Sequence, residues 1–210
     1  MKLVIFGATG RIGGHLVNWA VDAGHDVHAL ARHPEALRPR DGLTVTGGDV
    51  LDPATVAGVI SGADAVLSAL GPRGLDGFRK VELLAPAASN IIDGMHKTGA
   101  HRLISVSAAG AFVTEDPDMS WLVKQTLPRI FTRTYADVRR MEQVVRASDL
   151  DWTLVRPSRL VNQPGKGEYR VRADYAPPGG GKIARADVAH FIAAALTANS
   201  YIHQSPALSY

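Results

Sequence analysis

The feature that most constrains this chain is a glycine-rich turn close to its N-terminus. The turn, Gly7-Ala8-Thr9-Gly10-Arg11-Ile12-Gly13, directly follows an apolar run at 3–6 and opens a segment whose apolar residues recur at helical spacing. Gly7 permits a tight turn out of a strand, Gly10 lets a phosphate approach the backbone, and Gly13 lets the helix pack closely on the strand. In this strand–turn–helix order the motif predicts a dinucleotide site rather than a purely structural turn.

The same turn supplies groups that would bind phosphate. N–H groups at the start of a helix have no partner within the helix and carry a partial positive charge. Thr9 can add a hydroxyl and Arg11 a cation. The residues of the turn that we expect to contact the cofactor are Gly7, Thr9, Gly10, Arg11, Ile12 and Gly13.

Short apolar runs alternate with helical patterns along the rest of the chain. Strands are predicted at 3–6, 27–30, 43–46, 65–69, 103–106 and 153–155, and helices at 12–23, 53–60, 78–97 and 134–147. The third helix contains Pro86, where it can bend. The strands lack strict alternation, which is typical of parallel strands covered on both faces. The fold class is therefore predicted as α/β, with one doubly wound parallel-sheet Rossmann domain over residues 1–210.

Two segments interrupt this alternation, at about 110–130 and 162–182. Both are rich in proline or glycine and follow the fifth and sixth predicted strands. Ligands bind beyond the carboxyl ends of the strands in sheets of this kind. The segments are therefore candidate substrate lids, with ordinary surface loops as the alternative.

The residue after the second strand distinguishes two possible cofactors. Enzymes that use NAD place an acidic residue near this point, which binds the ribose hydroxyls. Here the position holds Arg32, and the first carboxylate is Glu35. A guanidinium can bind the 2′-phosphate of NADP through two hydrogen bonds, whereas a carboxylate would repel it. We therefore predict NADPH in preference to NADH, unless Arg32 is only a solvated surface residue.

Composition excludes several kinds of function. The chain has no cysteine, so it has no disulfide, thiolate metal site or cysteine nucleophile. Its eight histidines show no ligand-like spacing with carboxylates, and no metal site is expected. A net charge of +3 is too small to indicate nucleic acid, and no apolar stretch reaches membrane-spanning length. The chain is expected to be cytoplasmic and to act on a small molecule, as a monomer or a homodimer.

Four further motifs carry a family resemblance. They are Gly48-Asp49-Val50, Ala69-Leu70-Gly71, Asp151-Trp152-Thr153-Leu154-Val155-Arg156-Pro157 and Asn162-Gln163-Pro164-Gly165. Together with the glycine turn, they resemble the atypical short-chain dehydrogenase/reductases of the NAD(P)H-binding, NmrA-like family. Within that family the chain is most similar to the biliverdin-IXβ reductase/flavin reductase group.

The resemblance implies a place in the cofactor site for several residues. Asp49 and Val50 would lie beside the adenine, and Ser107 would face the nicotinamide. Pro157 would form a wall of the nicotinamide ring. The residues that would flank the ribose and pyrophosphate are Ala69, Leu70 and Gly71.

The chain departs from its relatives at the positions that carry catalysis. Ser107 is followed by Ala108, so half of the usual hydroxyl pair is missing. The Tyr-x-x-x-Lys motif is replaced by Tyr135-Ala136-Asp137-Val138-Arg139. Arginine does not tune a neighbouring tyrosine as lysine does, although it can supply positive charge. Ser107 and Tyr135 are candidate catalytic residues, with a strand-end cap and an ordinary helix residue as the alternatives.

These observations favour an NADPH-dependent reductase with a flat, conjugated acceptor such as a flavin or a linear tetrapyrrole. Phe112 and Trp121 could stack on such a substrate, and Arg159 could meet its acidic groups. The main alternative is a protein that binds NAD(P)H without turnover, as a redox sensor or regulator. Sugar-nucleotide epimerase or dehydratase chemistry fits poorly, because it needs the tyrosine–lysine pair and a larger C-terminal region.

Overall fold

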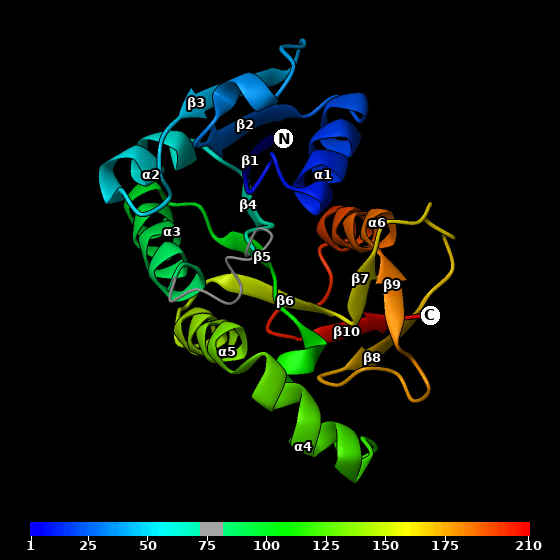
Figure 1. Cartoon of the computed structure of the whole chain (residues 1–210). Helices are drawn as coiled ribbons and strands as arrows, with labels where there is room; N and C mark the ends of the chain where they lie inside the picture. The colour runs from blue at the N-terminus through cyan, green and yellow to red at the C-terminus, as the bar shows by residue number, and fades with distance from the viewer. Residues whose placement is uncertain (72–81) are drawn as a thin grey trace.

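A twisted sheet crosses the centre of the protein in the computed structural model, which describes residues 1–71 and 82–210 (Figure 1). In the described residues the sheet has eight strands in the order β3-β2-β1-β4-β5-β6-β10-β8. The strands are β1 (Lys2–Phe6), β2 (Asp26–Ala31), β3 (Leu43–Gly47), β4 (Ala65–Ser68), β5 (Arg102–Val106), β6 (Asp151–Pro157), β8 (Arg170–Ala173) and β10 (Pro206–Ser209). All neighbours pair in parallel except β8, which runs antiparallel to β10.

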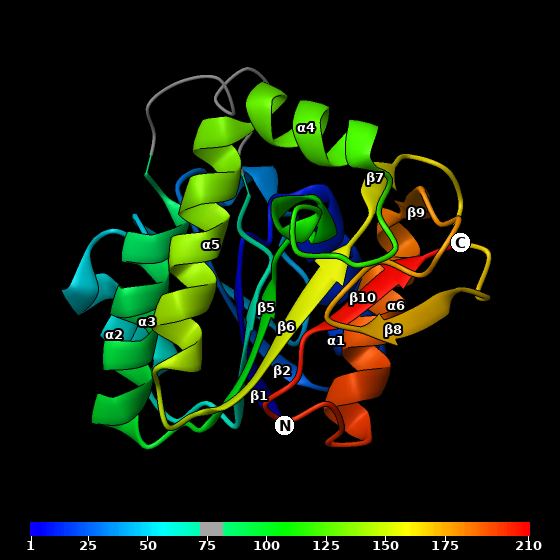
Figure 2. The same ribbon diagram turned by 90° about the horizontal axis from the view of Figure 1, so that it is seen from below.

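Helices cover both faces of the sheet, as Figures 1 and 2 show. On one face, α1 (Arg11–Asp22) packs against α6 (Arg185–Thr197). On the other, α3 (Leu84–Thr98) lies between α2 (Pro53–Ile60) and α5 (Thr132–Arg146). Each face has its own apolar core. Because β4 and β5 contribute side chains to both cores, they are buried along their whole length and show no alternation.

Parallel pairing brings the ends of the central strands to one edge of the sheet. Phe6 is in register with Leu30 and Ser68, and Val106 is in register with Val155. The residues that follow these strands therefore lie next to one another, although they are far apart in the sequence. This edge is where a doubly wound sheet binds its ligand.

The six predicted strands and four predicted helices are confirmed to within a few residues for the part of the chain that the structure describes. The helix predicted at 78–97 begins at Leu84 in the structure, and residues 78–81 lie outside the described residues. Pro86 falls in the first turn of α3. There its missing N–H removes no helical hydrogen bond, so the proline need not bend the helix.

The first turn of α3 is capped by a residue from a different helix. Asp137, on α5, is buried, and its two carboxylate oxygens accept hydrogen bonds from the backbone N–H groups of Leu83, Leu84 and Ala85 at 2.8–3.2 Å. Carboxylates at this end of a helix satisfy orphan donors and complement the helix dipole. Asp137 therefore ties α5 to α3, beside the strand edge.

The two interrupting segments are more ordered than the sequence predicts. The first contains a short 3-10 helix, Ala109–Phe112, and α4 (Trp121–Ile130), which extends away from the sheet in Figure 1. The second contains β8 and ends at β9 (Lys182–Ala184), which pairs with β7 (Arg159–Val161). Helix α4 was not predicted because it contains Pro128, and proline in a sequence argues against helical structure. The strands are three or four residues long, below the length at which a pattern is recognisable.

Two adjacent glycines in α1 offer a test of how tightly this helix meets β1. A Cβ atom at Gly13 would overlap the carbonyl oxygen of Gly7, whereas one at Gly14 would meet its nearest atom at 3.8 Å. We expect Gly13→Ala to lower the free energy of unfolding by about 2 kcal/mol or more, because backbone atoms must move apart. Gly14→Ala should raise it by about 0.5–1 kcal/mol, because alanine favours helix. Urea denaturation measures both values, and equal effects at the two positions would contradict the packing described.

Candidate functional site

A cavity of about 830 Å³ opens along the strand edge where the central strands end. Its walls come from the ends of β1, β2, β4 and β5, from the starts of α1, α5 and α6, and from β7. The lining includes most of the residues that the sequence predicts for the cofactor: Gly7, Thr9, Gly10, Arg11, Ile12, Arg32, Asp49, Val50, Ala69, Leu70, Gly71 and Ser107. The topology thus gathers positions separated by up to a hundred residues into one cavity.

The glycine turn lies in the middle of the cavity wall. Gly7 has a φ of +78°, and a Cβ atom there would come within 2.5 Å of the Ala69 carbonyl oxygen. The turn is closed by a hydrogen bond of 2.8 Å from the Gly10 N–H to the Gly7 carbonyl. Gly10 caps α1 without a side-chain hydrogen bond from the described residues. The N–H groups of the first turn of α1 therefore have no partner within the helix and can bind an anion that enters the cavity.

One end of the cavity is formed by the residues after β2 and β3. Arg32 and His33 line it from β2, and Asp49 and Val50 line it from β3. Asp49 is held in place by a hydrogen bond of 3.0 Å from the Leu51 N–H to its Oδ1. Val50 is held through its carbonyl, which accepts a hydrogen bond of 3.0 Å from the Asn90 side chain.

The other end is formed by the residues after β4 and β5 and by α5. Ser107, Ala108, Phe131 and Tyr135 line this part. Burial raises the pKa of the Tyr135 phenol, so its hydroxyl is protonated at neutral pH. A Cβ atom at Gly110 would overlap this hydroxyl, which shows how closely the segment after β5 approaches the tyrosine. The two candidate catalytic hydroxyls, of Ser107 and Tyr135, therefore share one end of the cavity.

Arg139, four residues after Tyr135, is not directed toward this tyrosine. Its Nε donates to the Ala111 carbonyl at 2.6 Å, its Nη2 donates to the Thr114 hydroxyl at 3.1 Å, and its Nη1 lies 3.6 Å from Glu115. The arginine therefore holds the segment after β5. The sequence suggested that Arg139 could supply positive charge to Tyr135, but its guanidinium is paired with other residues.

Five predicted site residues lie outside the lining of the cavity. Phe112 is only 8% exposed and packs beneath the guanidinium of Arg156, 3.5 Å from its ring centroid, so it is not placed to stack on a ligand. Trp121 is 73% exposed on α4, and Arg159 is exposed on β7. Gly13 and Pro157 are buried behind the wall. Gly13 is still required there, because it allows α1 to approach Gly7.

The structure adds lining residues that the sequence did not assign to the site, above all Arg185. It is the first residue of α6, and its Nη1 donates to the Asn162 side chain at 2.5 Å. Burial lowers the pKa of Arg185, and the positive charge of nearby Arg11 acts in the same direction. The sequence feature that could have predicted the place of Arg185 is the short strand β9, which leads directly into α6. A strand of three residues is too short to be recognised from its pattern. The other additions are Phe6, Leu30, Ala31, His33, Gly48, Leu83, Leu84, Val106, Ala108, Phe131, Thr134, Val138 and Leu160.

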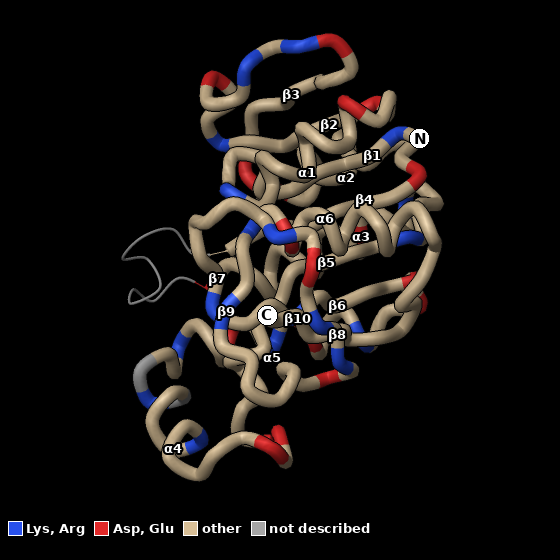
Figure 3. The backbone as a smooth tube through the Cα atoms, turned by 90° about the vertical axis from the view of Figure 1, so that its right-hand side faces the viewer, with Lys and Arg blue, Asp and Glu red and all other residues tan. Residues whose placement is uncertain are grey.

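The cavity is electrostatically positive. Arg11, Arg32 and Arg185 line it, against one carboxylate, Asp49, among the described residues. Elsewhere both signs of charge are interspersed along the backbone (Figure 3). A concentration of guanidinium groups beside a helix N-terminus favours a ligand that carries several negative charges.

In ranges 1–71 and 82–210, no three His, Asp or Glu side chains are placed so that they could share a metal ion. Within the same ranges, no helix is long and apolar enough to span a membrane.

Comparison with known proteins agrees with this geometry. An uncharacterized sugar epimerase of Bacillus subtilis, YhfK, is 30% identical over 204 residues, which cover 93% of this chain and 88% of that protein. A (4-alkanoyl-5-oxo-2,5-dihydrofuran-3-yl)methyl phosphate reductase of Streptomyces griseus is 29% identical, over 99% of this chain and 67% of that protein. The crystal structure of a putative epimerase from Bacteroides thetaiotaomicron has a TM-score of 0.84 and 26% identity, and covers 100% of this chain and 96% of that one.

The family itself is shown by a match to the model of NAD(P)H-binding proteins. The match spans residues 7–199, from the glycine turn through α6, and so includes every lining residue of the cavity except Phe6. It confirms the NAD(P)H-binding family that the motifs indicate. The chain therefore belongs to the NAD(P)H-binding family.

Proposed function

We propose that this chain is an NADPH-dependent oxidoreductase that passes hydride to a small planar acceptor, such as a flavin, a linear tetrapyrrole or a quinone. The observation that carries the proposal is the set of strand ends that line the cavity. In the order of the strands, the lining runs from Arg32 and Asp49, past the glycine turn, to Ser107, with Tyr135 on α5. A dinucleotide bound with its phosphates at the turn would place its adenine at the first end and its nicotinamide at the second.

The residues present fit such a cofactor. The volume of about 830 Å³ lies within the range of small-molecule sites. The close approach of Gly7 to Ala69 leaves backbone, rather than side chains, along the path of the pyrophosphate. Arg11 and Arg185 are available near the phosphates, and Arg32 extends the positive charge toward the position of a 2′-phosphate. The absence of a carboxylate at the end of β2 supports NADPH over NADH.

NADPH, when bound, supplies the hydride, and the residues of the chain supply position and surroundings. Leu70, Val138 and Leu160 form apolar parts of the wall, which favour a flat ring and exclude water. Tyr135 adds an aromatic ring, and Phe131 lies 5.4 Å from it, centroid to centroid. Positioning of donor and acceptor would account for most of the rate, because conjugated acceptors need no strong acid–base pair.

Two other functions are weaker on specific grounds. Epimerase chemistry, suggested by the name of the Bacillus subtilis relative, requires a tyrosine tuned by a neighbouring cation. In this chain, Arg139 is turned away from Tyr135. A redox sensor would bind NADPH without consuming it. Such a protein needs no apolar wall for an acceptor ring at the Ser107 end of the cavity. The relative from Streptomyces griseus is a reductase, which supports turnover.

The first test is whether the purified protein consumes NADPH when an acceptor is supplied. We expect saturable loss of absorbance at the NADPH band with FMN, and negligible loss without an acceptor. The assay is repeated with biliverdin and with a quinone. Tight NADPH binding with no turnover for any of the three acceptors would instead support the sensor.

The second test concerns Arg32 and the choice of cofactor. Arg32→Ala should weaken NADPH binding roughly tenfold or more, because a charge-assisted hydrogen bond contributes about 1.5–3 kcal/mol, and should leave NADH binding nearly unchanged. Arg40→Ala is the matched control, because Arg40 pairs with Asp22 at 2.6 Å and is not part of the cavity lining. Isothermal titration of both cofactors measures the effect. An equal loss for NADPH and NADH would show that Arg32 does not bind the 2′-phosphate.

A further inference from the structure

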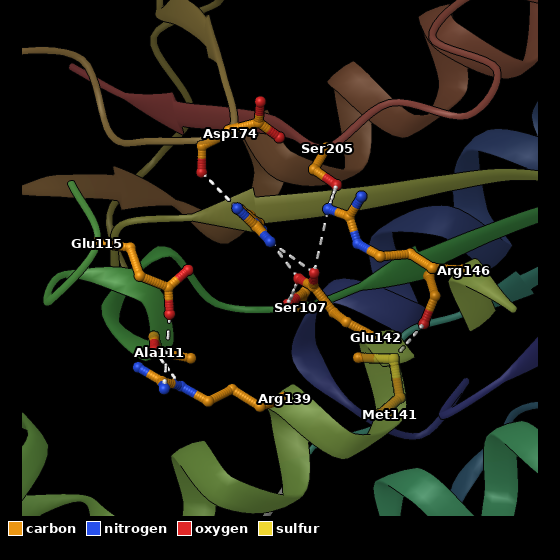
Figure 4. A network of polar contacts seen from close by, with 11 residues as sticks. Ser107, Ala111, Glu115, Arg139, Met141, Glu142, Arg146, Asp174 and Ser205 are labelled. Carbon is orange, nitrogen blue, oxygen red and sulfur yellow. Dashed lines mark hydrogen bonds and ion pairs between the residues drawn. The ribbon is translucent and has the colours of Figure 1, made fainter. Parts of the chain in front are cut away.

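A buried ion pair contacts the Ser107 hydroxyl (Figure 4), and neither of its two residues lines the cavity. Glu142, on α5, and Arg156, on β6, have side chains that are only 2% and 5% exposed. Arg156 Nε donates to Glu142 Oε1 at 2.9 Å, and its Nη2 donates to Oε2 at 2.6 Å. Ser107 Oγ lies 2.5 Å from the same Oε1. These three residues, Ser107, Glu142 and Arg156, form what we call the Glu142 cluster.

The pairing determines where the hydrogen of the Ser107 hydroxyl must point. Both oxygens of the Glu142 carboxylate accept from the guanidinium of Arg156, and a carboxylate paired in this way is an acceptor toward its other neighbours. The short contact between Ser107 Oγ and Glu142 Oε1 is therefore a hydrogen bond donated by the serine. The backbone N–H of Ser107 is also occupied, because it donates to the Val155 carbonyl at 2.7 Å. The hydrogen of the hydroxyl therefore points to Glu142, and the oxygen has only lone pairs to offer to a ligand in the cavity.

The surroundings of the cluster hold this orientation in place. The guanidinium of Arg156 lies over the Phe112 ring at 3.5 Å, and its Nη1 donates to the Asp174 carbonyl at 2.6 Å. Arg146 Nη2 lies 3.5 Å from Glu142 Oε2 and donates to the Ser205 hydroxyl at 2.5 Å. Reversing the Ser107 hydroxyl would remove one of the two hydrogen bonds that Glu142 Oε1 accepts and would leave two oxygen atoms facing each other without a hydrogen between them, which is unfavourable. The cluster is therefore a fixed support rather than an adaptable one.

We propose that Glu142 and Arg156 are positioning residues that hold Ser107 as a hydrogen-bond acceptor for the carboxamide N–H of the nicotinamide. This inference rests on the proposed function, in that NADPH occupies the cavity with its nicotinamide at the Ser107 end. The carboxamide provides the N–H donor of that ring, and a serine that offers only lone pairs is complementary to it. It follows that Ser107 does not donate the proton in the reduction, which comes from solvent or from another hydroxyl.

The experiment compares two cofactors in the absence of any acceptor. NADPH carries the carboxamide N–H, whereas the reduced 3-acetylpyridine analogue of NADPH has a methyl ketone there and no N–H. We expect the wild-type protein to bind NADPH about five- to tenfold more tightly than the analogue, the value of one hydrogen bond. In Ser107→Ala this preference should fall to near one, with most of the loss in NADPH affinity. Fluorescence titration gives the four dissociation constants.

The role of the buried pair is tested with Glu142→Gln. A glutamine can donate its own N–H to Ser107, which frees the hydroxyl to turn, so the preference for NADPH should also fall toward one. Glu115→Gln is the matched control, because Glu115 is another glutamate paired with a guanidinium, 3.6 Å from Arg139, but is half exposed. The control should keep the wild-type preference. Circular dichroism shows whether each variant is folded. If Glu142→Gln does not fold, the inference is tested by comparing Ser107→Ala with Ser107→Thr, which keeps the hydroxyl.

The outcomes separate this inference from the proposed function. Equal binding of the two cofactors by the wild type, or an unchanged preference in Ser107→Ala, would overturn the inference even if the protein reduces FMN. A preference that depends on Ser107 and Glu142 in a protein that turns over no acceptor would support the inference and overturn the reductase. Failure of the wild type to bind NADPH would overturn both.

Discussion

The close backbone contact between α1, β1 and β4 is the constraint on which the site depends. Gly7 turns out of β1 with a positive φ against the Ala69 carbonyl, and Gly13 brings α1 to within contact of Gly7. Side chains at either position would push the helix away from the strands. The first turn of α1 would then no longer face the cavity with its N–H groups. These two positions without a Cβ thus decide whether an anion can be bound at this edge of the sheet.

Strand register extends that local constraint to the whole cavity. Parallel pairing aligns Phe6 with Leu30 and Ser68, and the same pairing continues through β5 and β6. Each strand therefore ends at the same edge and delivers its next residues to one wall. The apolar cores on the two faces hold the strands in this register, because a shift would expose buried side chains to water. The packing of the two cores therefore fixes the distances between the residues that line the cavity.

The sequence was sufficient to predict what depends on local pattern. The six strands of the Rossmann core, the glycine turn and the strand-end residues Arg32, Asp49 and Ser107 all follow from periodicity, glycine spacing or resemblance. The missed elements have signals that are short or contradictory: α4 contains Pro128, and β7 and β9 have three residues each. Arg185 was missed because its place depends on such a strand. Phe112 was assigned to the substrate because an aromatic in a variable segment looks exposed, whereas Arg156 covers it.

Arginine residues illustrate the limit of what a sequence reveals about charge. Arg102 and Arg156 both lie in central strands, and their guanidinium groups donate hydrogen bonds to residues within the fold. Arg102 donates to the Asp151 and Ser200 carbonyls at 2.7 and 2.9 Å, and Arg156 pairs with Glu142. Arg32 and Arg185, one residue beyond a strand, line the cavity instead. Arg102 and Arg156 lie within strands and stabilise the fold, whereas Arg32 and Arg185 directly follow the carboxyl end of a strand, where a cation can meet a phosphate. Net charge alone cannot make this distinction, because it counts both kinds equally.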